Sequence, residues 1–407
     1  MKLLRPLLVI GTRPEAIKMA PVLTACLARK EIAPLVCLTG QHDEMLHQVT
    51  DYFGIRGDYD FKLMSPGQSL AQLTARCIAA LDETLQVAKP DCVVAQGDTT
   101  TVLAASIAAF YRRIPFVHVE AGLRTGDLAA PWPEEFNRRA TSLTTDLHCA
   151  PTRRAAENLR REGISAERIR VTGNTVIDAL LATMRRERSR DNQWRARHAW
   201  LGEKDLVLIT AHRRENHGSG LNDICAAVAT LARRFPAVAF IFPLHKNPAV
   251  QDVARAALGT IANVRLLPAL AYPEFVWLMG RAKVIASDSG GIQEEAPSLR
   301  KPVVALRETT ERQEAVEIGA VTLAGCSPER VEAAVARLLT DSRAYVAMQA
   351  VFNPFGDGHA AQRIVEWMLE RFLESGDREL PTSALVEAAE PGTGERTSAA
   401  QAQLVET

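Results

Sequence analysis

The sequence lacks the features that would place the protein in a specialised class. Its 48 basic and 48 acidic residues cancel, so the formal net charge at pH 7 is zero. Balanced charge gives no reason to expect a nucleic acid or a membrane surface as a partner. No apolar run approaches the length of a membrane-spanning helix. What remains is an ordinary globular chain of 407 residues, for which two domains are the natural expectation.

Paired cysteines and clustered metal ligands are also missing. The seven cysteines are scattered, mostly inside apolar runs, which favours reduced, buried thiols in a cytoplasmic protein over disulfides or a zinc site. No Asp, Glu or His cluster has the spacing of a metal cage, so we expect metal-independent chemistry. Arg5 and Pro6 interrupt the first apolar run, which indicates a β-strand rather than a signal peptide.

What the sequence does contain is a regular alternation of short apolar runs and longer helical patterns. This alternation is typical of α/β proteins with parallel sheets, and it recurs in both halves of the chain. The predicted strands are Leu7–Ile10, Leu35–Leu38, Cys92–Ala95, Pro115–Val119, Leu147–Ala150 and Ile169–Val171 in the first half, and Leu206–Thr210, Ala239–Pro243, Val264–Leu266, Val284–Ala286 and Pro302–Leu306 in the second.

The same pattern predicts the domain organisation. We expect an N-terminal domain over residues 1–174, which carries the catalytic loops, and a C-terminal domain over residues 175–352. A helix within residues 353–375 is expected to pack back on the N-terminal domain. Residues 376–407 are rich in Glu, Ala, Ser, Thr, Pro and Gly without periodicity, which predicts disorder.

The stretch 287–319 suggests the ligand. Residues 288–291 (DSGG) follow an apolar strand and precede a predicted helix over Ile292–Leu299. Two glycines, the free amides of a helix start and the Ser289 hydroxyl form a natural seat for phosphate. Glu294 and Glu295 would repel phosphate but could accept hydrogen bonds from sugar hydroxyls. Together these features point to a nucleotide-sugar site.

Nine ordered motifs then resemble the non-hydrolysing UDP-N-acetylglucosamine 2-epimerases of bacteria. The resemblance covers roughly residues 6–375, a domain-length match. The motifs are GTRPEAIKMAP (11–21), TGQH (39–42), QGDTTT (96–101), HVEAGLRTGD (118–127), PWPEEFNRR (131–139), TGNTVIDAL (172–180), AHRREN (211–216), PLHKNP (243–248) and SDSGGIQEEAP (287–297).

The resemblance implies two Rossmann-like domains that face each other across a cleft, as in GT-B glycosyltransferases. It also implies reversible inversion at C2 of the sugar, from UDP-GlcNAc to UDP-ManNAc, without a cofactor, in a homodimer that supplies precursors for cell-surface polysaccharide. Because no carbonyl acidifies the C2 proton, the family eliminates UDP to give 2-acetamidoglucal and adds it back. This route needs proton-moving groups near both faces of C2 and stabilisation of the departing UDP.

The family's catalytic positions fall on Asp98, Glu120, Glu134 and His212. The matching His holds or protonates the leaving UDP, a role that suits histidine near neutral pH. Each carboxylate also has a structural alternative. Asp98 could cap the next helix, Glu120 could form a salt bridge with Arg124 or Arg138, and Glu134 or Glu135 could be first-turn charges favoured by the helix dipole. His118 lies within a strand, and the sequence assigns it no chemical role.

The resemblance assigns substrate contacts to a further group of residues. Ser289, Gly290 and Gly291 would hold the diphosphate, and Glu295 the ribose hydroxyls. Phe275 would stack near uracil or, alternatively, belong to the core, and Arg138 would pair with the sugar or with Glu134. The group is Arg13, Lys18, Arg138, Phe275, Ser289, Gly290, Gly291, Glu295 and Arg312.

Bacterial members of the family also carry a second UDP-GlcNAc site that must be occupied for activity. The residues that stand where this allosteric site would be built are Gln41, His42, Gln68, Arg213 and His245. Gln41 and Gln68 each lie at a helix entrance, so helix capping is their structural alternative.

Other functions remain open at this stage. A GT-B glycosyltransferase would use the same UDP-binding half, and a catalytically silent sensor would keep the fold without chemistry. An epimerase of a related sugar nucleotide, such as UDP-2,3-diacetamido-glucuronate, shares much of the motif set. A hydrolysing epimerase is disfavoured because residues 376–407 are not a fused sugar-kinase domain.

Overall fold

The computed structural model describes residues 3–40, 43–63, 65, 67–211, 219–244, 247–349 and 352–374. Within the first half, strands and helices alternate as the sequence predicts. The elements are β1 (Pro6–Ile10), α1 (Arg13–Leu27), β2 (Leu35–Leu38), α2 (Asp43–Phe53), β3 (Tyr59–Asp60), α3 (Leu70–Ala88), β4 (Cys92–Gln96), α4 (Thr100–Tyr111), β5 (Phe116–Val119), α5 (Glu134–Thr144), β6 (Leu147–Ala150), α6 (Arg153–Arg161) and β7 (Ile169–Val171).

The second half repeats this alternation. Its elements are α7 (Thr175–Glu187), α8 (Asp191–Arg197), β8 (Leu206–Thr210), α9 (Ser219–Arg234), β9 (Ala239–Pro243), α10 (Pro248–Leu258), β10 (Val264–Leu267), α11 (Tyr272–Arg281), β11 (Val284–Ser287), α12 (Gly290–Glu295), β12 (Val303–Ala305), α13 (Gln313–Glu317), β13 (Val321–Leu323), α14 (Pro328–Thr340), α15 (Ser342–Ala347) and α16 (Ala360–Leu369).

The strands form two separate parallel sheets. The first has the order β3-β2-β1-β4-β5-β6-β7 and the second the order β10-β9-β8-β11-β12-β13. In both sheets the strand order reverses beside a central strand, between β1 and β4 and between β8 and β11. Loops that follow two such strands diverge and leave a crevice, where ligands of open α/β sheets bind. The prediction of two Rossmann-like domains is confirmed.

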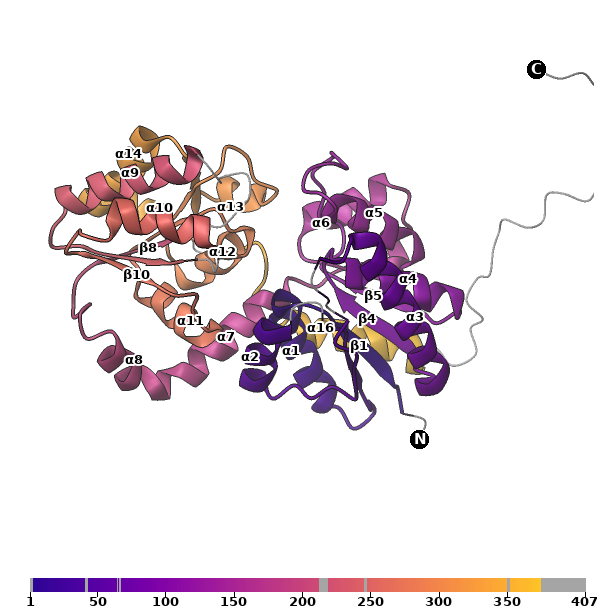
Figure 1. Cartoon of the computed structure of the whole chain (residues 1–407). Helices are drawn as coiled ribbons and strands as arrows, with labels where there is room; N and C mark the ends of the chain where they lie inside the picture. Colours follow the sequence, from indigo (N-terminus) through magenta and orange to yellow (C-terminus); the bar gives the residue numbers. More distant parts are fainter. Residues whose placement is uncertain are drawn as a thin grey trace, which may run out of the picture.

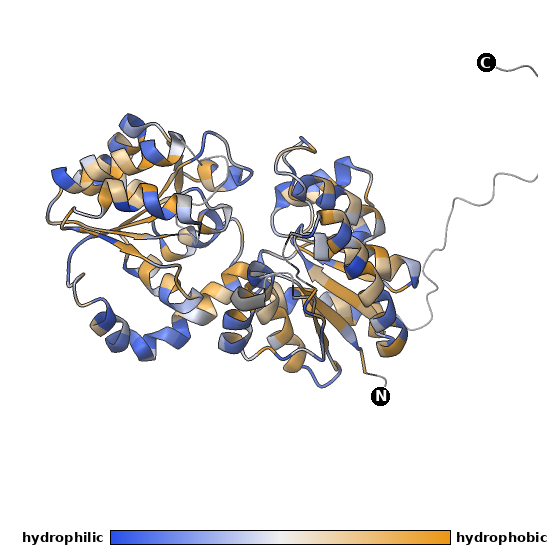
Figure 2. Cartoon of the chain, in the orientation of Figure 1, coloured by the Kyte–Doolittle hydropathy of each residue, from blue (hydrophilic) through white to orange (hydrophobic). Residues whose placement is uncertain are grey.

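The hydrophobic strands form the interior of each half. All five residues of β1 and of β8 are buried, because helices cover both faces of a parallel sheet. Figure 2 shows the strands mainly in the colour of hydrophobic residues, with hydrophilic residues on outward helix faces. Burial of each Leu, Ile or Val side chain contributes roughly 1.5–3 kcal/mol, so the sheets are stable supports for the loops at their edges.

The two sheets lie in two lobes that are joined through α7 (Figure 1). Helix α7 contacts α1 of the first lobe and also α11 and α12 of the second. Although α16 follows the second sheet in the chain, it packs against α1 and α7. The domain boundaries at residues 174 and 352 stay predictions, and the tail 376–407 lies outside the described residues.

Asp178 of α7 fixes the start of α16. Its carboxylate accepts hydrogen bonds from the backbone N–H of Ala360 at 3.2 Å and of Ala361 at 2.9 Å. The first amides of a helix have no partner within that helix. The Asp178 carboxylate therefore caps the N-terminus of α16 from the neighbouring helix α7.

Replacing Asp178 by Ala should therefore lower the free energy of unfolding by about 1–2 kcal/mol, because two buried amides lose their acceptor. Urea denaturation of the wild type and of Asp178→Ala measures this difference. Asp178→Asn keeps one carbonyl oxygen and should lie between them. Equal midpoints for all three proteins would show that the contact does not hold α16.

Several elements differ from the sequence prediction. The edge strands β3 and β13 are two and three residues long, too short for a periodic signal. The helix expected over Ile292–Leu299 begins at Gly290 and changes to a 3-10 helix over Ala296–Leu299. Pro297 explains the change, since it lacks the N–H that an α-helix needs there. Among the described residues, no helix is long and apolar enough to cross a membrane.

Candidate active site

A cavity of about 640 Å³ lies at the carboxyl ends of strands from both sheets. Both strand-order reversals contribute to its wall, as expected for a ligand site in this architecture. The first half supplies Thr12, Arg13, Pro14, Ile17, Lys18 and Thr99, and the second half supplies, among others, Thr210, Leu270, Tyr272, Phe275, Ser289, Gly291 and Glu295.

The turn between β1 and α1 is tightly fixed. Thr12 is the N-cap of α1 and forms a capping box with Glu15. The Glu15 carboxylate accepts from the backbone N–H of Gly11 at 2.5 Å and of Thr12 at 2.8 Å, and from the Thr99 hydroxyl. A Cβ at Gly11 would lie 2.2 Å from Oγ1 of Thr101, so only glycine fits. Burial raises the pKa of Glu15 to about 7.

Helix α1 directs two cations to the cavity. The Arg13 guanidinium donates to the backbone carbonyl of Leu270 in the second half at 3.0 Å. The Lys18 ammonium lies 2.5 Å from Glu120 and 3.9 Å from Glu294. Burial alone would lower the pKa of Lys18, but these two carboxylates outweigh burial and raise it. Neither cation is therefore an ordinary surface charge.

Glu120 directly follows β5 and is held in an unusual backbone conformation. Its φ is 66°, in the left-handed region that costs a non-glycine residue of the order of 1 kcal/mol or more. The buried carboxylate accepts from Lys18 at 2.5 Å, from the Gln96 amide at 2.9 Å and from the Asn174 amide at 3.3 Å. Burial opposes ionisation, but Lys18 and Arg312 outweigh it and lower the pKa of Glu120.

This environment decides between the sequence interpretations of Glu120. Its ion pair is with Lys18, whereas Arg124 pairs with Glu162 at 2.7 Å. The predicted alternative of a salt bridge with Arg124 or Arg138 is therefore wrong. Lys18 keeps Glu120 ionised next to the cavity, which is the state that a base requires.

Asp98 follows β4, and it does not cap the next helix. Thr99 is the N-cap of α4, so the capping alternative for Asp98 is wrong. Its carboxylate accepts from Arg138 of α5, from Nε at 3.0 Å and from Nη2 at 2.9 Å. Its backbone carbonyl accepts from the Asn137 amide at 2.8 Å. Helix α5 thus binds both the side chain and the backbone carbonyl of Asp98.

The two neighbouring glutamates at the start of α5 differ. Glu135 is fully buried and accepts from Arg138 at 2.6 Å and from the backbone N–H of Thr125 at 3.2 Å. The expectation that Arg138 pairs with Glu134 is therefore wrong, because Glu135 takes that position. Glu134 is half-buried and forms no ion pair among the described residues, so its assignment as the catalytic glutamate of the pair stays a prediction.

The loop after β11 is built as the sequence predicts, from Ser289 and two glycines. Ser289 is the N-cap of α12, and its backbone N–H donates to Oγ of Ser287 at 3.0 Å. A Cβ at Gly290 would lie 2.9 Å from the guanidinium carbon of Arg312. The glycine therefore allows this buried cation to lie directly against the loop.

The paired carboxylates after the glycines face different partners. Glu295 lines the cavity and accepts from the Tyr272 hydroxyl at 3.0 Å, and burial raises its pKa to about 7. Glu294 is fully buried, and it accepts from Arg312 at 2.9 Å and from the Asn174 amide at 3.1 Å. Arg312, predicted as a substrate contact, therefore already carries an ion pair in this structure.

Phe275 is placed for either of the two roles that the sequence left open. Its half-buried ring lines the cavity and packs against the hydrophobic core. It is therefore available for stacking without leaving the core.

Known proteins with this sequence and fold can now be compared. A family profile described as UDP-N-acetylglucosamine 2-epimerase matches residues 24–369. The chain belongs to this family.

Individual members are similar over nearly the whole described chain. The UDP-N-acetylglucosamine 2-epimerase of Escherichia coli K12 is 48% identical over 367 residues, which cover 89% of this chain and 98% of that protein. The crystal structure of the Neisseria meningitidis enzyme bound to UDP-GlcNAc has a TM-score of 0.87 at 46% identity, with 90% and 100% coverage. The Methanocaldococcus jannaschii enzyme, in complex with UDP-GlcNAc and UDP, has a TM-score of 0.79 at 32% identity, with 90% and 100% coverage.

The remaining predicted residues have two different outcomes. His212, Arg213, Gln41, His42 and His245 lie outside the described residues. Gln68 is described, and it lies one residue before Ser69, which is the N-cap of α3. Ser69 and Gln72 form the capping box there, so the capping alternative for Gln68 is wrong.

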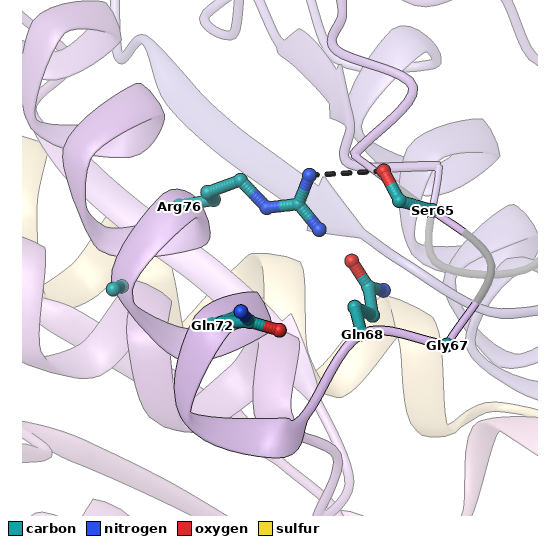
Figure 3. A pocket seen from close by; sticks show the side chains of 6 residues that line it. Ser65, Gly67, Gln68, Gln72 and Arg76 are labelled. Carbon is teal, nitrogen blue, oxygen red and sulfur yellow. Dashed lines mark hydrogen bonds between the residues drawn. The ribbon is translucent and has the colours of Figure 1, made fainter.

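Gln68 instead lines a second cavity, of about 590 Å³, at the start of α3. Figure 3 shows the Gln68 side chain between the loop that carries Ser65 and the helix that carries Arg76. The Arg76 guanidinium donates to the Ser65 hydroxyl at 3.0 Å. This polar hollow is separate from the wall of the main cavity.

Sequence reasoning missed several residues that hold the site. Glu15 could have been found, because Thr12-x-x-Glu15 is a capping-box pattern. The amide of Asn174, which joins Glu120 to Glu294, has no such local signal, since its partners are 54 and 120 residues away in the chain. Tyr272 and His118 likewise act through distant partners.

Proposed function

We propose that the protein interconverts UDP-GlcNAc and UDP-ManNAc by inverting C2 of the sugar through elimination and re-addition of UDP. The observation that carries the proposal is the pairing of two different sites at one cavity. The loop of Ser289 and Gly291 on one side suits a nucleotide diphosphate. On the other side Lys18 and Thr99 line the cavity. Lys18 binds Glu120, and Thr99 directly follows Asp98, whose carboxylate binds Arg138. These two carboxylates suit proton transfer.

The second half would hold the part of the substrate that leaves and returns. The amides of Gly290 and Gly291 and the Ser289 hydroxyl can donate to the diphosphate, and Arg13 supplies countercharge from across the cavity. Glu295 can accept from the ribose hydroxyls, with Phe275 beside the base. The N. meningitidis relative was crystallised with UDP-GlcNAc, which supports this kind of ligand.

The first half would carry the chemistry. A carboxylate removes the C2 proton, the electrons form the C1=C2 double bond, and the C1–O bond breaks with its electron pair on the β-phosphate of UDP. The resulting 2-acetamidoglucal accepts the UDP oxygen back at C1, while a proton is delivered to the opposite face of C2. The candidate groups are Glu120, Asp98 and Glu134. Lys18 holds Glu120 in its ionised form, and His212 would assist the leaving UDP.

A product assay separates this proposal from its alternatives. Incubation with UDP-GlcNAc alone should yield UDP-ManNAc at equilibrium, as measured by chromatography or NMR. If UDP-GlcNAc is not converted but UDP-2,3-diacetamido-glucuronate is, the protein is the related epimerase. If instead the sugar is transferred to an added acceptor, it is a glycosyltransferase. The names of the relatives favour UDP-GlcNAc.

We also propose that the cavity at Gln68 belongs to an activating site for a second UDP-GlcNAc molecule. A pocket with an exposed arginine, a serine and glutamine amides suits the phosphates and hydroxyls of a nucleotide sugar. The rate should then depend sigmoidally on UDP-GlcNAc, and the reverse reaction from pure UDP-ManNAc should stall until UDP-GlcNAc is added.

Arg76→Ala, which removes the charge of this pocket, should raise the UDP-GlcNAc concentration needed for activation about tenfold. Steady-state kinetics in both directions measure this change. Arg29→Ala, two residues after the end of α1 and paired at the surface with Glu31, is the control. Hyperbolic kinetics in the wild type would contradict the activating site.

A homodimer is proposed from the family, and one surface supports it. Large apolar side chains on the neighbouring helices α3, α4 and α5 are more than half exposed, namely Val87, Phe110, Tyr111, Phe136 and Leu143. Large exposed apolar side chains on adjacent helices are typical of interaction surfaces. Tyr111→Glu together with Leu143→Glu should give a monomer in sedimentation analysis, whereas an unchanged mass would exclude this face.

We propose a cytoplasmic location from the chemical state of the cysteines. All seven are free. Burial raises the pKa of Cys26 to about 12 and of Cys77 to about 11, so these thiols stay protonated and unreactive. Buried free thiols of this kind are common in reducing compartments.

A further inference from the structure

His118 is a fully buried histidine to which the sequence assigned no role. It lies in β5, and its Nε2 is 2.7 Å from the backbone carbonyl of Gly97. The β4–β5 ladder ends at the pair Gln96 and Val119, so Gly97 is the first residue beyond the sheet. Asp98 follows immediately. We propose that His118 is a positioning residue, whose imidazole holds the Gly97 carbonyl and thereby orients Asp98 for proton transfer at C2.

The direction of this hydrogen bond is fixed by its partner. A carbonyl oxygen only accepts, so His118 must carry its proton on Nε2 and donate it. Burial lowers the pKa of His118 to about 4, with the Gly97 carbonyl opposing that shift and Arg124 adding to it. The ring is therefore neutral near pH 7 and serves as a permanent donor rather than as a proton carrier.

The turn at Gly97 is held by hydrogen bonds, because no side chain of its own restrains it. Its φ is +91°, and a Cβ built there would meet no atom within 4 Å. Glycine has more accessible backbone conformations than any other residue. The Gly97 N–H donates to the Val119 carbonyl at 3.0 Å, and the His118 ring binds the carbonyl of the same residue. The Gly97 carbonyl lies in the same planar peptide group as the N–H of Asp98, so the bond from His118 sets the plane that leads into Asp98. The bond from the Gly97 N–H fixes the preceding peptide group.

The other end of the turn is held from α5. Asn137 donates to the Asp98 carbonyl, and Arg138 donates to its carboxylate. His118 therefore completes a set of donors that bind Asp98 from the sheet side and from the helix side. Without the imidazole, the peptide before Asp98 could rotate while the carboxylate stayed tethered to Arg138. A misplacement of about 1 Å in a catalytic group lowers rates by about 10²-fold.

The test rests on the proposed function, because it assumes that Asp98 moves a proton. His118→Leu should lower kcat about 10²-fold with a KM for UDP-GlcNAc within about threefold of wild type, since the UDP loop is untouched. His118→Gln, whose amide nitrogen reaches as far as Nε2, should recover most of kcat. His118→Asn, whose amide is one bond shorter, should not. UDP titration calorimetry counts the folded sites in each variant, so that kcat is expressed per folded site.

His148→Leu is the matched control, because His148 is equally buried and lies opposite His118 on β6. It should keep kcat within about threefold of wild type. Asp98→Asn is measured in parallel. If Asp98→Asn is inactive but His118→Leu keeps full kcat, or His118→Gln is as slow as His118→Leu, the positioning role is wrong. If Asp98→Asn is fully active, the proposed role of Asp98 is wrong and the inference falls with it.

Discussion

Glu120→Gln should lower kcat for epimerisation about 10³-fold, the largest effect that we expect from a single isosteric change. The amide cannot take a proton, and general acid–base catalysis contributes roughly 10²–10⁴-fold to rates. Lys18 would also lose its partner at 2.5 Å. UDP binding should change much less, because the loop at Ser289 is intact. Single-turnover kinetics with UDP-GlcNAc, together with UDP calorimetry, measure both quantities.

Glu162→Gln is the control for this prediction. Glu162 also forms an ion pair, with Arg124 at 2.7 Å, but its partner does not line the main cavity, whereas Lys18 does. Its variant should keep kcat within about threefold of wild type. A Glu120→Gln enzyme with normal kcat would remove Glu120 from the chemistry, whatever its contacts with Lys18.

Glu295→Ala should weaken UDP binding about 10–100-fold, because hydrogen bonds from ribose to a buried carboxylate are worth roughly 1.5–3 kcal/mol. It should not change the face of C2 that is protonated, since the proton-moving groups lie in the other half. Calorimetry with UDP measures the first effect, and NMR of the product measures the second. Glu317→Ala, an exposed glutamate paired with Arg154, is the control. Normal UDP affinity in Glu295→Ala would exclude Glu295 as the ribose ligand.

The pH dependence of UDP binding tests the same carboxylate. Burial raises the pKa of Glu295 from 4.5 to about 7. Its contribution to folding stability is therefore fully present below pH 4.5 and declines as pH rises through about 7. A ligand that donates to the carboxylate prefers the ionised form, so UDP affinity should rise from pH 6 to pH 8. Comparison with Glu295→Gln removes the titration of UDP itself, and equal slopes would contradict this role.

Much of the fold could be predicted because its strands are buried on both faces. Leu206–Thr210 and Ala239–Pro243 are continuous apolar runs, and both begin and end where the sequence indicated. The edge strands β3 and β13 gave no such signal, since each is only two or three residues long and partly exposed. The start of α12 at Gly290 was also missed, because glycine has a low intrinsic preference for helix.

The sequence predicted which residues belong to the site better than it predicted which of them bind one another. The family resemblance pointed to Asp98, Glu120 and Lys18, but it did not reveal that Lys18 binds Glu120 or that Arg138 binds Asp98. These partners are 102 and 40 residues apart in the chain. Only the strand order, which brings β1, β4 and β5 side by side, places them together. Local sequence carries no signal for such contacts.

The central claim is that C2 loses its proton and regains one from water during the reaction. The most direct measurement is to incubate the wild-type enzyme with UDP-GlcNAc in deuterated water without any acceptor, and to follow C2 by NMR. We predict one deuterium at C2 in the UDP-ManNAc that forms and, at equilibrium, in the UDP-GlcNAc pool. UDP-ManNAc that retains the original hydrogen at C2, or substrate that stays unchanged, would contradict the account.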